Sequence, residues 1–127
     1  MRILLDTSVL IDVLRGRQDR RILLRRLAGE GHSLSTTVLN IAELYAGMRP
    51  GEEARTEEFL SGLESYELSA SAARAAGRLK NIWQTKGRTL TLSDTIIAAI
   101  AIEQQCILLT DNRKDFPMTE VTHFPQP

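Results

Sequence analysis

The sequence predicts an α/β protein with three layers, in which helices cover both faces of a short, mostly parallel central sheet. Short apolar runs of strand length alternate along the chain with longer segments of helical periodicity, which is the pattern of a parallel α/β fold. The first run, Ile3 to Leu5, is apolar at every position, as expected of a central strand buried on both faces. Several apolar runs end on acidic residues, and ligands of parallel sheets collect at the carboxyl ends of strands. We therefore expect a functional site at that edge.

The size and composition indicate one soluble domain. The chain has 127 residues, of which 43% are hydrophobic and 25% are charged, so we expect a single domain over residues 1–127. No apolar run reaches the roughly 20 residues that span a membrane. The start lacks a signal-peptide pattern, because Met1 and Arg2 lead directly into a run that meets Asp6 too early. A cytoplasmic protein without membrane association is the expectation.

Further strands are expected where short runs stand between helical segments. These runs are Ser33 to Ser35, Tyr66 to Leu68 at an edge of the sheet, Ile107 to Thr110 and Val121 to Phe124.

The helices are predicted from apolar periodicity, capping residues and glycines. The first is capped by Thr7 or Ser8 and ends near Gly16. The others are a helix through Ile22 and Leu27 that ends at 29–31, Val38 to Met48, Glu52 to Leu63, a helix through Ala72 and Trp83 that Ser69 or Ser71 caps and Gly87 ends, and a helix through Ile96 and Ile102 that Ser93 caps. The last has no polar face, which predicts burial between layers or at a subunit contact.

Charge and cysteine content exclude several classes of protein. The single cysteine, Cys106, excludes an internal disulfide and a sulfur-ligated zinc cluster. Sixteen basic and sixteen acidic residues cancel, so the chain lacks the net positive charge of many nucleic-acid binders. Basic residues do gather locally, from Arg15 to Arg26 and again at Lys80, Lys86 and Arg88. Such groups are either solvated helix faces or contacts for phosphate or a partner.

Four acidic residues are candidate metal ligands, although each has a structural alternative. Asp6, followed by Thr7, is also a capping arrangement, and Asp94 at a helix start gains from the helix dipole. Asp111 stands in a good turn sequence. Glu43 lies in an apolar helical run, where a buried charge is costly unless it is paired or bound to metal. Together the acids predict a cation site.

With Asp6, Glu43, Asp94 and Asp111 in this order, the chain resembles the PIN-domain ribonucleases, and within them the VapC-type toxins of bacterial type II toxin–antitoxin pairs. The similarity covers nearly the whole chain. Three segments carry it, namely Ile3 to Ile11, Asn40 to Leu44 and Leu92 to Ala99. The resemblance implies a PIN-like fold, dependence on Mg²⁺ or Mn²⁺, an RNA substrate, a homodimer, and inhibition by a small antitoxin in a larger hetero-oligomer.

Metal chemistry suggests roles for these acids, because Mg²⁺ prefers oxygen ligands. Asp6 and Asp94 would hold the metal directly, while Glu43 would orient water or a second ion. Asp111 would complete the shell, although Asn112 or Asp115 could fill that fourth position. Hydroxyl groups placed to support these ligands belong to Thr7, Ser8 and Thr110.

Substrate phosphates must approach this acidic pocket, so nearby cations must offset its charge. Arg15 and Arg17, just after the first helix, are the first candidates, and Lys86 and Arg88 are the next.

A catalytically inactive PIN-like scaffold that binds RNA or a protein is the alternative function. A haloacid-type phosphatase is disfavoured because it needs an aspartate where this chain has Ser8, and a dinucleotide-binding dehydrogenase because it needs a glycine-rich turn after the first strand.

Overall fold

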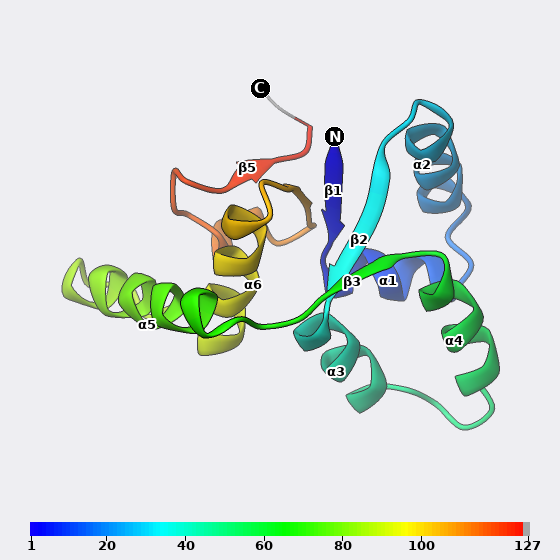
Figure 1. Cartoon of the computed structure of the whole chain (residues 1–127). Helices are drawn as coiled ribbons and strands as arrows, with labels where there is room; N and C mark the ends of the chain where they lie inside the picture. The colour runs from blue at the N-terminus through cyan, green and yellow to red at the C-terminus, as the bar shows by residue number, and fades with distance from the viewer. Residues whose placement is uncertain (126–127) are drawn as a thin grey trace.

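Five parallel strands form one sheet in the order β3-β2-β1-β4-β5 (Figure 1). The structure is a computed structural model that describes residues 1–125. The strands are β1 Arg2–Leu5, β2 Ser33–Thr37, β3 Glu64–Tyr66, β4 Ile107–Leu109 and β5 Thr122–His123. The predicted three-layer α/β/α fold is confirmed, and every strand pairing within the described residues is parallel.

Helices pack on both faces of this sheet (Figure 1). They are α1 Thr7–Leu14, α2 Gln18–Gly29, α3 Val38–Ala46, α4 Glu53–Ser61, α5 Ala70–Thr85 and α6 Leu92–Glu103, with a short 3-10 helix, η1 Arg113–Asp115. Side chains alternate along β1, so Leu4 packs with α5 and α6 while Ile3 and Leu5 pack with α1 and α2. Because both faces are covered, the run Ile3 to Leu5 is apolar at every position, as the sequence indicated, and only Arg2 at the start of β1 is exposed.

The sequence of β2 indicated a strand only weakly, and the structure shows the reason. Ser35, Thr36 and Thr37 have no exposed surface, although a buried central strand is usually rich in large apolar residues. Their hydroxyls are satisfied by hydrogen bonds, since Ser35 Oγ donates to the Ile3 carbonyl at 2.9 Å and Thr36 Oγ1 to the Leu5 carbonyl at 3.0 Å. The strand is therefore longer than the predicted Ser33 to Ser35.

The helix starts correct two of the predicted caps. Asp6, and neither Thr7 nor Ser8, is at the N-cap position of α1. Helix α6 is capped by Thr91, whose hydroxyl accepts from the Asp94 amide, and not by Ser93. Both helices begin one or two residues earlier than predicted, so their N-cap residues also lie earlier in the chain.

Other boundaries agree with the sequence or shift slightly. Ser69 caps α5 as predicted, accepting from the Ala72 amide at 2.9 Å. Gly87 follows the end of α5 with a φ of +87°, a left-handed conformation that favours glycine. Strand β3 forms two residues before the predicted Tyr66 to Leu68. Helix α6 is buried against α5 and the sheet, and no helix in residues 1–125 is long and apolar enough to cross a membrane.

Candidate active site

The carboxyl ends of β1, β2 and β4 meet at one edge of the sheet. The chain leaves β1 toward β2 on one side, whereas β4 lies on the other side of β1, so this edge is the position where open parallel sheets usually bind ligands. Asp6 directly follows β1 and Thr110 directly follows β4. Since Leu5 is in register with Leu109, the next residues of the two strands come together here.

Asp6 is held by two hydrogen bonds at this position. Its side chain is only 6% exposed. Asn40 Nδ2 donates to Asp6 Oδ1 at 3.0 Å, and Thr110 Oγ1 donates to Asp6 Oδ2 at 2.6 Å. The carboxylate makes no capping hydrogen bond to α1, so the capping interpretation of this residue does not hold. Both carboxylate oxygens instead accept from side chains of other elements, which fixes the orientation of the group.

Asn40 is the residue that connects Asp6 to the next segment. It lies in the first turn of α3 with no exposed surface. Its Nδ2 also donates to Thr7 Oγ1 at 3.0 Å, while its Oδ1 accepts from Thr37 Oγ1 at 2.7 Å. Sequence reasoning did not assign a role to Asn40. The available signal was a polar residue between Leu39 and Ile41 on a helix with few polar side chains.

Glu43 lies one turn further along α3 and faces solvent. The expectation that it is buried is wrong, because α3 buries Asn40 and Leu44 instead. Thr7 Oγ1 donates to Glu43 Oε1 at 2.7 Å, and Ser93 Oγ donates to Glu43 Oε2 at 3.3 Å. The carboxylate is thus held between the start of α1 and the start of α6.

Asp94, the neighbour of Ser93, is half-buried in the first turn of α6. Burial raises the pKa of its carboxyl above the ordinary aspartate value, and the hydrogen bond with Thr91 partly opposes this rise. Nearby negative charges add to it, in the order Asp115, Asp6 and Glu43. The carboxylates from four segments therefore share one electrostatic environment.

Asp115, rather than Asp111, is the further acid whose charge acts on Asp94. Asp111 is exposed, and its carboxylate forms an ion pair with Arg20, which also pairs with Asp12. Asp115 is half-buried on η1, and its charge acts on Asp94. Of the three residues considered for this position, the structure therefore favours Asp115, which the sequence left open. Asn112 donates its backbone amide to Thr110 and its side chain is exposed.

The donor set fits a hard divalent cation, because it consists of carboxylates with hydroxyl and amide supports. As the side chains lie, no three His, Cys, Asp or Glu side chains within residues 1–125 are close enough together to bind one ion directly. Mg²⁺ typically takes one or two protein carboxylates and retains several waters. The arrangement fits that mode better than a cage of four direct ligands, and the metal site stays a prediction.

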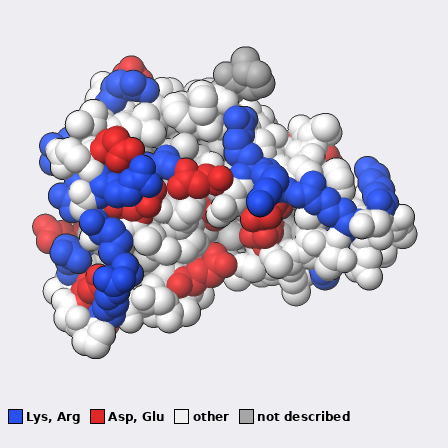
Figure 2. Space-filling view, turned by 180° about the vertical axis from the view of Figure 1, so that it is seen from behind, with Lys and Arg blue, Asp and Glu red and all other residues white. Residues whose placement is uncertain are grey.

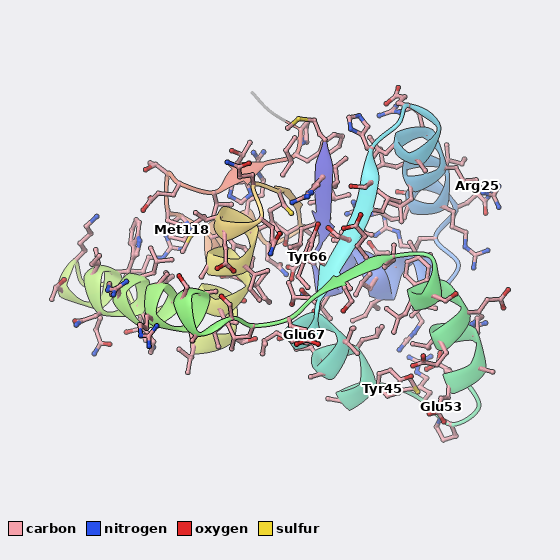
Figure 3. All side chains as sticks on the ribbon, in the orientation of Figure 1. Arg25, Tyr45, Glu53, Tyr66, Glu67 and Met118 are labelled. Carbon is pink, nitrogen blue, oxygen red and sulfur yellow. The ribbon has the colours of Figure 1, made fainter. Side chains whose placement is uncertain are left out.

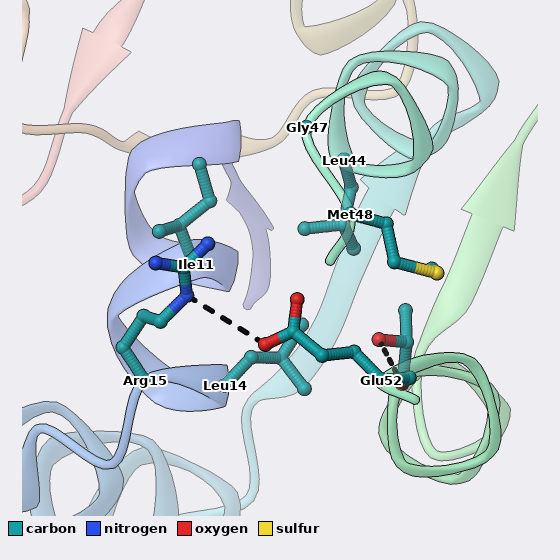
Figure 4. A pocket seen from close by; sticks show the side chains of 8 residues that line it. Ile11, Leu14, Arg15, Leu44, Gly47, Met48 and Glu52 are labelled. Atoms are coloured by element: carbon teal, nitrogen blue, oxygen red, sulfur yellow. Dashed lines mark hydrogen bonds and ion pairs between the residues drawn. The ribbon is translucent and has the colours of Figure 1, made fainter. Parts of the chain in front are cut away.

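Arg15 and Arg17 lie away from the acids, at the other end of α1. The eight-residue helix separates the two ends by about 12 Å. Arg15 Nε is 3.8 Å from Glu52 Oε2 across a pocket between α1, α3 and the start of α4 (Figure 4). Arg17 pairs with Asp12 and Asp19. Both arginines are thus engaged with carboxylates of this chain.

Comparison with known proteins identifies relatives over the full length of the fold. Residues 3–120 match the PIN domain family. The chain is 36% identical over 115 residues to ribonuclease VapC19 of Mycobacterium tuberculosis, covering 91% of this chain and 92% of that protein. It is 34% identical to ribonuclease VapC10 of the same species, with 93% and 88% covered.

Solved structures give the same fold. VapBC2 from Rickettsia felis bound to a DNA fragment from its promoter superposes with a TM-score of 0.87 at 24% identity, covering 97% of each chain. A toxin–antitoxin complex from Klebsiella pneumoniae superposes with a TM-score of 0.77 at 26% identity, covering 98% of this chain and 99% of that one.

Proposed function

The chain belongs to the PIN domain family and is of the VapC type, and we propose on this basis that it is a metal-dependent endoribonuclease. It would act in the cytoplasm as the toxin of a toxin–antitoxin pair. The support comes from two directions, since relatives at 34% and 36% identity are named ribonucleases and hydrogen bonds join the segments that carry Asp6, Glu43 and Asp94.

The observation that carries the proposal is a chain of hydrogen bonds that joins the three family segments. Asn40 bonds to Asp6 and Thr7, Thr7 bonds to Glu43, and Ser93, beside Asp94, also bonds to Glu43. These residues come from α1, α3, α6 and the end of β1. Asn40 and Asp6 are buried, where polar groups are costly unless they are satisfied, while Glu43 at the other end of this chain faces solvent. A fixed polar network that opens to solvent at the ligand-binding edge favours an active site over a bare scaffold.

The side chains have properties that suit phosphodiester hydrolysis. A bound Mg²⁺ would neutralise the phosphate and supply an activated water. Asp6 offers a buried carboxylate of fixed orientation, and Asp94 a half-buried one. Glu43 faces solvent with both oxygens held, so its carboxylate can accept a hydrogen bond from an incoming water and orient it. Mn²⁺, with similar oxygen preference, could replace Mg²⁺.

The partner we propose is a small antitoxin, because solved structures of the same fold are toxin–antitoxin complexes. A homodimer that assembles with antitoxin into a larger hetero-oligomer remains part of this proposal. A catalytically inactive scaffold is the alternative.

An RNA cleavage assay with Asp6→Asn tests the enzyme. The purified chain should cleave total RNA with Mg²⁺ and stop when EDTA removes the metal. Asp6→Asn should lose cleavage by at least two orders of magnitude with an unchanged circular dichroism spectrum, because it removes the buried charge but keeps the side-chain shape.

Asp19→Asn is the matched control, since Asp19 is an exposed acid on α2 and its change should leave cleavage intact. Full activity of Asp6→Asn would remove Asp6 from the site. A parent protein without activity in either Mg²⁺ or Mn²⁺, despite a native spectrum, would favour the scaffold.

A further inference from the structure

The basic side chains of this protein fall into two kinds according to their partners. Arg15 and Arg17, between α1 and α2, and Arg20 on α2 each form an ion pair with an acid of the same chain. Their charge is partly neutralised before any ligand arrives. Phosphate binding requires cations whose charge is available, because affinity for nucleic acid comes from displacing counterions by Lys and Arg.

Other cations have no acidic partner within 4.0 Å in the described residues, among them Arg25 and Arg26 of α2 and four residues in the loop after α5 and in η1. We call these last four, Lys86, Arg88, Arg113 and Lys114, the basic shelf. All four are exposed, and none has an acidic group within 4.0 Å in the described part of the chain. Figure 2 shows Lys and Arg in a band over the half of the molecule that contains α5, whereas on the other half they are mixed with Asp and Glu.

Hydrogen bonds join the two segments of the basic shelf. The Arg88 guanidinium donates to the carbonyl of Lys114, which ties the loop after α5 to η1. That loop is itself anchored, since the Arg88 amide donates to the Trp83 carbonyl at 3.0 Å and the Lys86 ammonium lies 4.6 Å from the centre of the Trp83 ring. The cations therefore stand on a fixed backbone.

Each segment of the basic shelf is adjacent in sequence to a segment that carries a candidate acid. Arg88 lies four residues before Leu92, the first residue of α6, whose first turn carries Asp94. Lys114 is the immediate neighbour of Asp115 on η1. A strand of RNA whose phosphate reaches the acids can thus place its next phosphates over cations, which offsets the repulsion from the carboxylates.

We propose that the basic shelf binds the phosphates of the RNA strand on one side of the cleaved bond, in place of Arg15 and Arg17. This inference rests on the proposed ribonuclease function and adds the path of the substrate. The contact is to the backbone and so is independent of base sequence.

Binding of an uncleaved RNA tests the basic shelf separately from catalysis. All variants are made in the Asp6→Asn background, and a fluorescein-labelled single-stranded oligoribonucleotide of mixed sequence is titrated at several salt concentrations. For single strands the slope of log affinity against log salt is about −0.7 per phosphate contact. Arg88→Ala/Lys114→Ala should therefore reduce the slope by about 1.4 and weaken binding roughly 25-fold near 0.1 M salt.

Two matched pairs control for the general loss of positive charge. Arg25→Ala/Arg26→Ala removes two exposed cations of α2, where Arg25 projects away from the sheet (Figure 3), and should leave the slope unchanged. Arg15→Ala/Arg17→Ala should do the same. The charge-preserving pair Arg88→Lys/Lys114→Arg should retain most of the affinity, which separates loss of charge from loss of structure.

The proposal is overturned if the Arg88→Ala/Lys114→Ala protein keeps the parent slope, or if all three alanine pairs lose affinity equally. A failure of the proposed enzyme function would appear elsewhere, as a parent protein that binds this RNA but does not cleave it with Mg²⁺. Thermal unfolding of each variant checks that the fold is retained.

Discussion

Replacing Thr110 by valine tests how much the support of Asp6 contributes to the fold. Valine has nearly the shape of threonine but has no hydroxyl group, so the change deletes hydrogen bonds without opening a cavity. Thr110 is 6% exposed. Its Oγ1 donates to Asp6 Oδ2 at 2.6 Å and accepts from the Asn112 amide at 3.0 Å.

The expected cost follows from these two contacts. A hydrogen bond to a charged group contributes about 1.5–3 kcal/mol, and the loss leaves a buried carboxylate oxygen without its donor. The backbone amide of Asn112 belongs to an exposed residue, so water can replace the Thr110 hydroxyl as its hydrogen-bond acceptor. We therefore expect Thr110→Val to lower the free energy of unfolding by about 2–3 kcal/mol. For a chain of 127 residues this corresponds to a decrease in Tm of roughly 8–11 °C.

Thermal and urea unfolding followed by circular dichroism measure this cost, with Thr110→Ser as the control that retains the hydroxyl. The serine variant should lose less, because only a methyl group is removed. RNA cleavage should decrease in Thr110→Val, since Asp6 is no longer held at one oxygen. A valine variant that unfolds within 1 °C of the parent and cleaves RNA at the parental rate would refute this account of Asp6.

Two other substitutions test separate features of the fold. The pKa of Asp94 is raised above its ordinary value of 3.8, so in metal-free protein the ionisation of this carboxyl costs stability as pH rises through and above that range. Asp94→Asn should therefore be more stable than the parent at neutral pH without metal, and its Tm should rise less when Mg²⁺ is added. Equal Mg²⁺-induced shifts in Tm for both proteins would contradict this. Ser69→Ala removes the N-cap of α5 and should lower the free energy of unfolding in urea by about 1 kcal/mol. RNA cleavage should stay unchanged, and a large loss of cleavage would show that α5 takes part in the site.

The local pattern of residues was enough to predict most of the elements. The run Ile3 to Leu5 predicted β1, the run after Cys106 predicted β4, and Ser69 and Gly87 marked the ends of α5. These features depend on neighbours in sequence, namely apolar periodicity, capping hydroxyls and a left-handed turn. Strand β2 was predicted too short because its buried residues are small and polar, and what stabilises them is the β1 backbone, which lies about 30 residues away in the chain.

The acids were found in the sequence, but their surroundings were not. Asp6, Glu43 and Asp94 stand where the sequence placed them, at the end of a strand and on two helices. The burial predicted for Glu43 was wrong, because helical periodicity gives the face of a helix but not which part of that face its neighbours cover. The choice of Asp115 over Asp111 depends on Arg20, an arginine of α2 that pairs with Asp111.

The sequence by itself determined the succession of strands and helices along the chain and the three-layer class, and it named Asp6, Glu43 and Asp94 as candidate acids. These follow from periodicity and from side-chain chemistry along a short stretch of chain. Only the tertiary structure decided that Asn40 links Asp6 to Glu43 through Thr7, and which cations are left without an acidic partner. Such contacts join segments that meet only when β1, β2 and β4 align their carboxyl ends, so no local pattern contains them.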